Sequence, residues 1–177
     1  MLRLEWERAG ERTVLWRDDR ECSQYSVQFL LSQSLPPRAL VSYPGSGNTW
    51  TRYLVEAATG VFTGSVYSDP GIYTAGHLGE RREYSDGSTL LQKTHHSAVG
   101  ESHNSLTWRR HHIKQFGGRA VLVIRNPYKA ILSYWNLLQT GSQTKTADSG
   151  TLKGKKFKLF VADGAGRWLD LIQGSTG

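Results

Sequence analysis

The stretch between Ala39 and Gly60 constrains the fold of this 177-residue chain more than any other part of it. It opens with a short apolar run that predicts a strand over residues 39–43, followed by a glycine-rich turn. Apolar side chains then recur at helical spacing, and Gly60 supplies a C-terminal stop. The recurring positions are Trp50, Tyr53, Leu54, Ala57 and Ala58. A strand, a glycine loop and a helix in this order are typical of α/β proteins.

The same pattern returns later in the chain. Residues 120–124 form a continuous apolar run, which predicts a strand covered on both faces. Asn126 can cap a helix and Pro127 suits its first position. Two strand–loop–helix units predict a central parallel sheet with right-handed crossovers, in a three-layer, P-loop-like α/β fold.

The remaining segments carry weaker signals. Residues 1–37 read as an irregular, charged lead-in, so we place the folded domain at residues 38–177. Residues 61–88 are rich in loop-forming residues, 90–94 predict a short strand, and apolar positions between 157 and 172 predict one or two closing helices. A sheet of about three strands is smaller than the usual four to six. We therefore expect the chain to be incomplete at its C-terminus.

The amino-acid composition limits the kinds of partner and site that this chain can have. The net charge of +7 favours polyanions, a class that includes nucleic acids, acidic glycans and nucleotides. We find no recognised nucleic-acid motif and expect no nucleic-acid partner. Cys22 is the only cysteine, which excludes an intrachain disulfide and a cysteine-ligated metal site. No apolar run is long enough to span a membrane, and residues 1–20 lack the apolar core of a secretory signal.

The glycine loop is the first candidate site. Backbone N–H groups between a strand and a helix point at one spot, and the helix dipole adds positive potential there, so a phosphate binds well. The residues concerned are Gly45, Ser46, Gly47, Asn48 and Thr49. The alternative is an ordinary tight turn. A nucleoside-triphosphatase loop would carry lysine where Asn48 stands, which weakens a kinase or ATPase interpretation.

Arg125 is the second candidate. It leaves the predicted strand at its carboxyl end, the edge at which ligands sit in open α/β sheets. A guanidinium there can contact a phosphate through two hydrogen bonds. Ser133 lies eight positions further on, about two helical turns, and can face the same phosphate. The alternative is a solvated surface arginine.

The third candidate is the run from Lys93 to His95, at the end of a predicted strand. Lysine offers a point charge to an anionic leaving group, and histidine accepts a hydroxyl proton near neutral pH. Alternate residues of a strand project to the same side, so these two side chains are expected to converge. The competing candidates for the base are His96 and the carboxylate of Glu80.

Together the three segments resemble the PAPS-dependent sulfotransferases, which use 3'-phosphoadenylyl sulfate (PAPS) as sulfonate donor. That family has a loop of the form Tyr-Pro-Lys-Ser-Gly-Thr-Thr-Trp and a Lys-Thr-His segment. It also has an Arg-Asn-Pro segment with a serine eight residues after the arginine. This chain has similar segments in the same order, at residues 43–50, 93–95 and 125–133.

The resemblance implies an in-line transfer of a sulfonate to a hydroxyl. His95 would accept the acceptor's proton, and Lys93 would offset charge on the sulfonate and the leaving phosphate. The backbone N–H groups of Ser46 to Thr49, with the Thr49 hydroxyl, would hold the 5'-phosphate. No metal is required, because fixed hydrogen-bond donors can stabilise the charge.

The resemblance also implies how the nucleotide would be held. Arg125 and Ser133 would bind the 3'-phosphate, the group that distinguishes PAPS from ATP. Trp50 would stack on the adenine. The alternative for Trp50 is a place in the core beneath its helix.

The similarity is closest to the WSC-domain-containing sulfotransferases, over roughly residues 22–138. The segments that carry it are residues 25–30, 35–37, 43–55, 79–81 and 125–130. It implies an enzyme of the Golgi membrane, acting on the lumenal side on a glycan such as one bearing sialic acid. The membrane anchor is not expected within this chain.

One departure from the family pattern concerns catalysis. Gly45 stands where many sulfotransferases carry a lysine that contacts the donor. The resemblance therefore leaves a second hypothesis open, a catalytically degenerate module of the same fold that binds the donor or a glycan.

Overall fold

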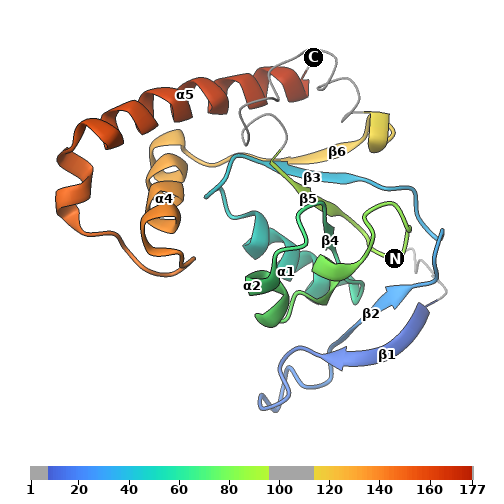
Figure 1. Ribbon diagram of the computed structural model, residues 1–177. Coiled ribbons are helices and arrows are strands. Elements are labelled where there is room, and N and C mark those ends of the chain that lie inside the picture. The colour runs from blue at the N-terminus through green and yellow to red at the C-terminus, as the bar shows by residue number, and fades with distance from the viewer. Residues whose placement is uncertain (1–7, 96–113, 177) are drawn as a thin grey trace. The chain divides into compact units, whose positions relative to one another are not determined.

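The computed structural model describes residues 8–95 and 114–176 and divides the chain into two compact units. The first unit comprises Met1–Leu40, Thr49–Thr94 and Ile113–Val121. The second comprises Val41–Asn48, His95–His112 and Leu122–Gly177. Figure 1 shows the chain coloured along its length.

A four-stranded parallel sheet confirms the α/β class. Its strand order is β4-β5-β3-β6, with bounds Gly64–Ser65, Gln92–Thr94, Ala39–Ser42 and Ala120–Val123. The sheet has one strand more than the three expected. The additional strand, β4, pairs Gly64 with Gln92 and Ser65 with Lys93. It is only two residues long, so it has no periodicity by which the sequence could reveal it.

The N-terminal lead-in is not irregular as predicted. Strands β1 (Arg8–Val14) and β2 (Ser26–Leu30) pair antiparallel, with Val14 opposite Ser26. Figure 1 shows this hairpin in blue. Val27 and Leu30 are buried, and the Phe29 ring lies 4.5 Å from that of Phe62. The high charge content of this segment concealed the two strands, because charged residues are depleted in strands.

The segment predicted as loop, residues 61–88, holds short elements. Helix α2 (Pro70–Thr74) begins with proline, and the Asp69 side chain caps it by accepting the backbone N–H groups of Gly71 and Ile72. A 3-10 helix, η1, follows at Leu78–Arg81. Elements this short are too brief for a helical period to emerge in the sequence.

The predicted helix after the glycine loop is confirmed as α1 (Asn48–Thr59). Gly60 ends it with a positive φ of 67° and a hydrogen bond of 2.9 Å from its N–H to the Glu56 carbonyl. The second predicted helix is confirmed as α4 (Pro127–Thr140). Its cap is Asn126, whose side chain accepts the Lys129 N–H at 3.3 Å.

In the second unit, a single long helix closes the chain, α5 (Lys155–Thr176), preceded by the 3-10 helix η3 (Ser149–Lys153). Helix α4 packs against it through Trp135, whose ring lies 5.2 Å from Phe157 and 5.1 Å from Phe160. Helix α5 does not combine the length and the apolar character needed to cross a bilayer, and neither does any other helix within residues 8–95 and 114–176.

Strand β6 departs from the prediction of a strand covered on both faces. Val121 is 48% exposed, and the adjoining Ile124 is 58% exposed. The strand lies at one end of the sheet order, β4-β5-β3-β6. A continuous apolar run therefore marks an edge strand here.

Candidate functional site

Tyr43, a buried residue of the second unit, fixes the start of the loop that follows β3. Its ring packs edge-on against Tyr134 of α4, with centroids 6.0 Å apart. The loop turns back through a 3.1 Å hydrogen bond from the Ser46 N–H to the Tyr43 carbonyl. A side chain at Gly164 of α5 would lie 2.8 Å from the Tyr43 hydroxyl, so the two are closely packed. The base of the loop is thus held by α4 and α5.

Gly45 packs directly on the backbone of α4. It has a positive φ of 77°, and a Cβ there would lie 2.4 Å from the Ala130 carbonyl oxygen and 3.0 Å from the Tyr134 nitrogen. No side chain fits at that position unless the loop moves away from the helix. A lysine therefore cannot be introduced at this position by substitution alone.

Gly45→Ala is expected to cost more stability than Gly47→Ala, its matched control. Both glycines have positive φ, but nothing lies within 4 Å of a Cβ at Gly47. The difference should be about 1–3 kcal/mol in the free energy of unfolding, the usual cost of overpacking. Urea denaturation of the two variants measures it, and equal losses would show that the loop does not press on α4.

Ser46 presents an unsatisfied polar atom in the loop. Its side chain is 7% exposed, and its Oγ has no hydrogen-bond partner within the described part of the chain. A buried hydroxyl without a partner is unfavourable by about 1–3 kcal/mol. Its neighbour Asn48 donates from Nδ2 to the Ser42 Oγ at 3.1 Å and begins α1. An incoming oxyanion would satisfy the Ser46 hydroxyl at the start of this helix.

Arg125 contacts the glycine loop. Its Nη1 donates a 2.7 Å hydrogen bond to the Gly45 carbonyl. Ser133 also lies beside the loop, because its Cβ is 3.1 Å from the position that a Cβ at Gly45 would occupy. The structure therefore brings together the loop, the arginine and the serine within the second unit.

His95 is held by the strand that precedes the loop. Its Nδ1 lies 2.9 Å from the Ser42 carbonyl oxygen and 3.4 Å from the Ser42 Oγ. A carbonyl only accepts hydrogen bonds, so Nδ1 carries the proton. In the neutral ring Nε2 is then the basic nitrogen, the tautomer that a general base needs. The competing candidate His96 lies outside the described residues.

Trp50 and Thr49 belong to the first turn of α1, in the first unit. The Trp50 side chain is 64% exposed, so the alternative that it forms helix core is wrong. Its ring stacks near Tyr53, with centroids 6.2 Å apart and an interplanar angle of 21°. Stacking on adenine stays a prediction, as does a role for the half-buried Thr49 hydroxyl.

Lys93 lies in the first unit and is only 6% exposed. Burial lowers the pKa of its ammonium group, and the negative charge of Glu80 partly opposes this. The ammonium lies 5.7 Å from the centre of the Tyr67 ring. His95 belongs to the other unit, so the expected convergence of the two side chains stays a prediction.

A buried charge network in the first unit was missed by the sequence analysis. Arg52 and Glu80 form an ion pair in which both side chains are fully buried. Arg52 also donates to the Thr63 hydroxyl at 2.8 Å, and Glu80 accepts the Asp69 N–H at 3.0 Å. No signal in the sequence marked it, because Arg52 and Glu56 lie four positions apart on the face of the predicted helix opposite its apolar positions, where charged side chains are normally solvated.

This network bears on whether Glu80 can act as the general base. Glu80 is occupied by Arg52 and by a backbone N–H and has no exposed surface. A substrate hydroxyl cannot reach it without breaking the pair. Gly79 is equally constrained, because a Cβ there would lie 1.9 Å from the Thr63 carbonyl oxygen. Residues 79 and 80 are thus explained by packing rather than by catalysis.

Comparison with known proteins finds similarity to insect proteins named as WSCD family members. One from Drosophila melanogaster is 38% identical over 140 residues, which cover 77% of this chain and 39% of the relative. One from Aedes aegypti is 37% identical over 133 residues, covering 73% of this chain and 37% of the relative. The chain thus spans about two fifths of the length of these relatives. No family model and no solved structure matches it.

Proposed function

We propose that this chain, homologous to WSCD family members over about three quarters of its length, is the donor-binding part of a PAPS-dependent sulfotransferase. The observation that carries the proposal is the hydrogen bond from Arg125 to the Gly45 carbonyl. It sets a guanidinium beside a glycine loop at the start of a helix, where two phosphate-binding elements converge. The buried Ser46 hydroxyl, which lacks a partner among the described residues, supports an anionic ligand there.

The proposed reaction moves a sulfonate from PAPS to a hydroxyl of a glycan in the Golgi lumen. The acceptor oxygen forms a bond to sulfur as the bond from sulfur to the 5'-phosphate breaks, and 3',5'-ADP leaves. The hydroxyl proton passes to Nε2 of His95, whose tautomer is set by its bond to Ser42. The loop N–H groups and Lys93 offset the charge that develops on the leaving phosphate.

Arg125→Ala is expected to weaken the binding of 3',5'-ADP by at least about 1.5 kcal/mol, roughly tenfold, the lower value for a charged hydrogen bond. Titration calorimetry on the parent and the variant measures the change. Arg17→Ala, which removes an exposed arginine of the first unit, is the control for net charge. Equal affinity in the parent and Arg125→Ala contradicts the assignment, and tighter binding of ATP than of 3',5'-ADP favours a kinase-like protein.

A second candidate function is a binding module that has lost turnover. The observation that favours it is the packing of Gly45 on α4, which leaves no room for the donor-contacting lysine that many sulfotransferases carry there. Both candidates bind 3',5'-ADP, and only the first transfers sulfonate. Incubation with labelled PAPS and a panel of glycans separates them.

A further inference from the structure

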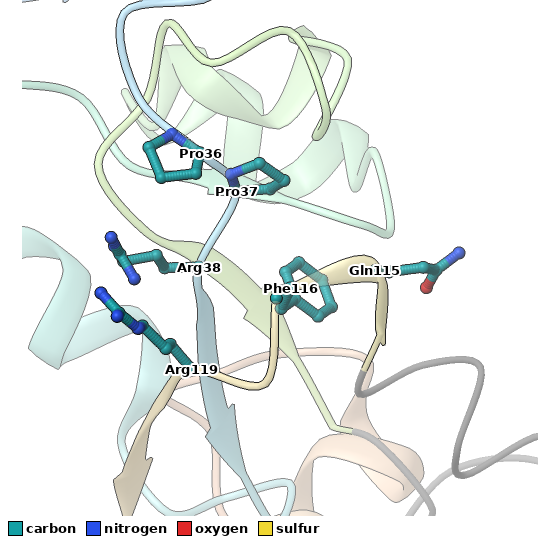
Figure 2. Close-up of a pocket in the computed structure, with 7 residues that line it drawn as sticks. Pro36, Pro37, Arg38, Gln115, Phe116 and Arg119 are labelled. Carbon is teal, nitrogen blue, oxygen red and sulfur yellow. The ribbon is translucent and has the colours of Figure 1, made fainter.

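A hollow of about 320 Å³ opens within the first unit, and none of its lining residues belongs to the candidate site described above. Figure 2 shows the guanidinium groups of Arg38 and Arg119 extending to the same side of it. It is lined by Pro36, Pro37, Arg38, Gln115, Phe116, Gly117 and Arg119. We call this hollow the arginine pocket.

The sheet holds the two arginines of the arginine pocket together. Arg38 immediately precedes β3 and Arg119 immediately precedes β6, and these strands are neighbours. The Ala39 N–H donates to the Arg119 carbonyl at 3.3 Å, and the Gln92 N–H donates to the Arg38 carbonyl at 2.7 Å. Both backbones are therefore fixed at the amino ends of their strands, whereas the glycine loop follows the carboxyl end of β3.

The walls of the arginine pocket are also fixed. Arg119 follows a tight turn in which Gly117 and Gly118 have φ of 59° and 68°, and its N–H donates to the Phe116 carbonyl at 3.1 Å. Phe116 is buried, with its ring 6.0 Å from that of Tyr84. On the other side, the paired prolines restrict the backbone. A preformed pocket loses little conformational freedom when a ligand binds.

The arginine pocket carries charge that nothing described in the structure neutralises. Within residues 8–95 and 114–176, neither the Arg38 nor the Arg119 side chain forms an ion pair or hydrogen bond. Lys114, which is exposed, adds a third cation to the same segment. Guanidinium forks match the geometry of carboxylate and sulfate oxygens. An anion would therefore find complementary donors here.

We infer that the arginine pocket binds a small organic oxyanion, a carboxylate or a sulfate ester, on a ligand about the size of one sugar ring. Small-molecule sites span about 300–1,000 Å³, and this hollow lies at the lower end of that range. The two guanidinium groups bind the acid, and the prolines contact the remainder of the ligand. The arginine pocket shares no residue with the proposed donor site, and the inference does not depend on sulfonate transfer.

Nuclear magnetic resonance titration of the chain tests the inference. Glucuronate and glucose 6-sulfate are the probes, because they share a ring and differ in the acid, and glucose is the uncharged control. We expect saturable shifts of the Arg38 and Arg119 Nε–H signals with at least one acid and none with glucose. Whichever acid binds more tightly identifies the oxyanion.

Matched variants separate the arginine pocket from general electrostatics. Arg38→Gln and Arg119→Gln should each weaken binding by at least about tenfold, as expected for a charged hydrogen bond. Arg20→Gln, which removes an exposed arginine elsewhere in the first unit, should leave it unchanged. An absence of saturable binding, an equal loss in Arg20→Gln, or displacement of the acid by 3',5'-ADP would each overturn the inference.

Discussion

Replacing Glu80 by glutamine is expected to lower the free energy of unfolding by about 3–5 kcal/mol, the cost of breaking a buried ion pair from one side. The Arg52 guanidinium would stay fully buried without a charged partner at residue 80, held by the Thr63 hydroxyl and carbonyl and by at most a neutral amide oxygen of the glutamine. Water cannot reach it to replace the lost carboxylate, so the uncompensated charge is the source of the loss. Urea denaturation of the parent and the variant measures the effect.

Two controls show whether burial is the cause. Asp163→Asn removes one partner of an exposed pair, Arg167 with Asp163, and should change stability by less than about 1 kcal/mol. The double variant Arg52→Met with Glu80→Met removes both charges and should recover much of the loss of Glu80→Gln. If Glu80→Gln were as mild as Asp163→Asn, the network would not be the internal support that its burial indicates.

The elements with long periodic patterns were predictable from the sequence, and the short ones were not. Helices α1 and α4 were marked by apolar periodicity, and Asn126 and Gly60 marked two of their ends. Strand β4 and the elements between Thr63 and Arg81 are held by contacts with distant residues. Local propensity carries no information about such contacts.

Some features of the candidate site were likewise predictable from the sequence, and others were not. A glycine loop and an arginine at a strand end were visible as motifs, and their contact follows from the rule that parallel strands share a carboxyl edge. The tautomer of His95 and the packing of Gly45 depend on the positions of Ser42 and Ala130, which no spacing encodes. The charge network was concealed because buried charged pairs look like solvated ones in a sequence.

The edge position of β6 could not have been derived from its composition. An apolar run reads as fully buried whether neighbouring strands lie on one side or on both. The number of strands, and hence which strand lies at the end of the order, is a property of the whole sheet.

In any length of this protein that transfers sulfonate, His95→Ala is expected to lower kcat by about 10²–10⁴-fold, the usual contribution of a positioned general base. The affinity for 3',5'-ADP should change little, because the base meets the acceptor hydroxyl and not the nucleotide. Lys93→Ala should instead lower both, since its charge would meet the donor. Steady-state transfer rates at several pH values and calorimetry with 3',5'-ADP give the two readouts.

His95→Asn is the variant that separates catalysis from structure. The asparagine Nδ2 can replace the histidine Nδ1 as donor to the Ser42 carbonyl, so the local hydrogen bond is retained while the basic Nε2 is lost. We expect this variant to unfold like the parent, to bind 3',5'-ADP like the parent, and to be as slow as His95→Ala. Near-parental turnover in His95→Asn would show that the ring holds the strand end and that another group, with His96 the first to test, accepts the proton.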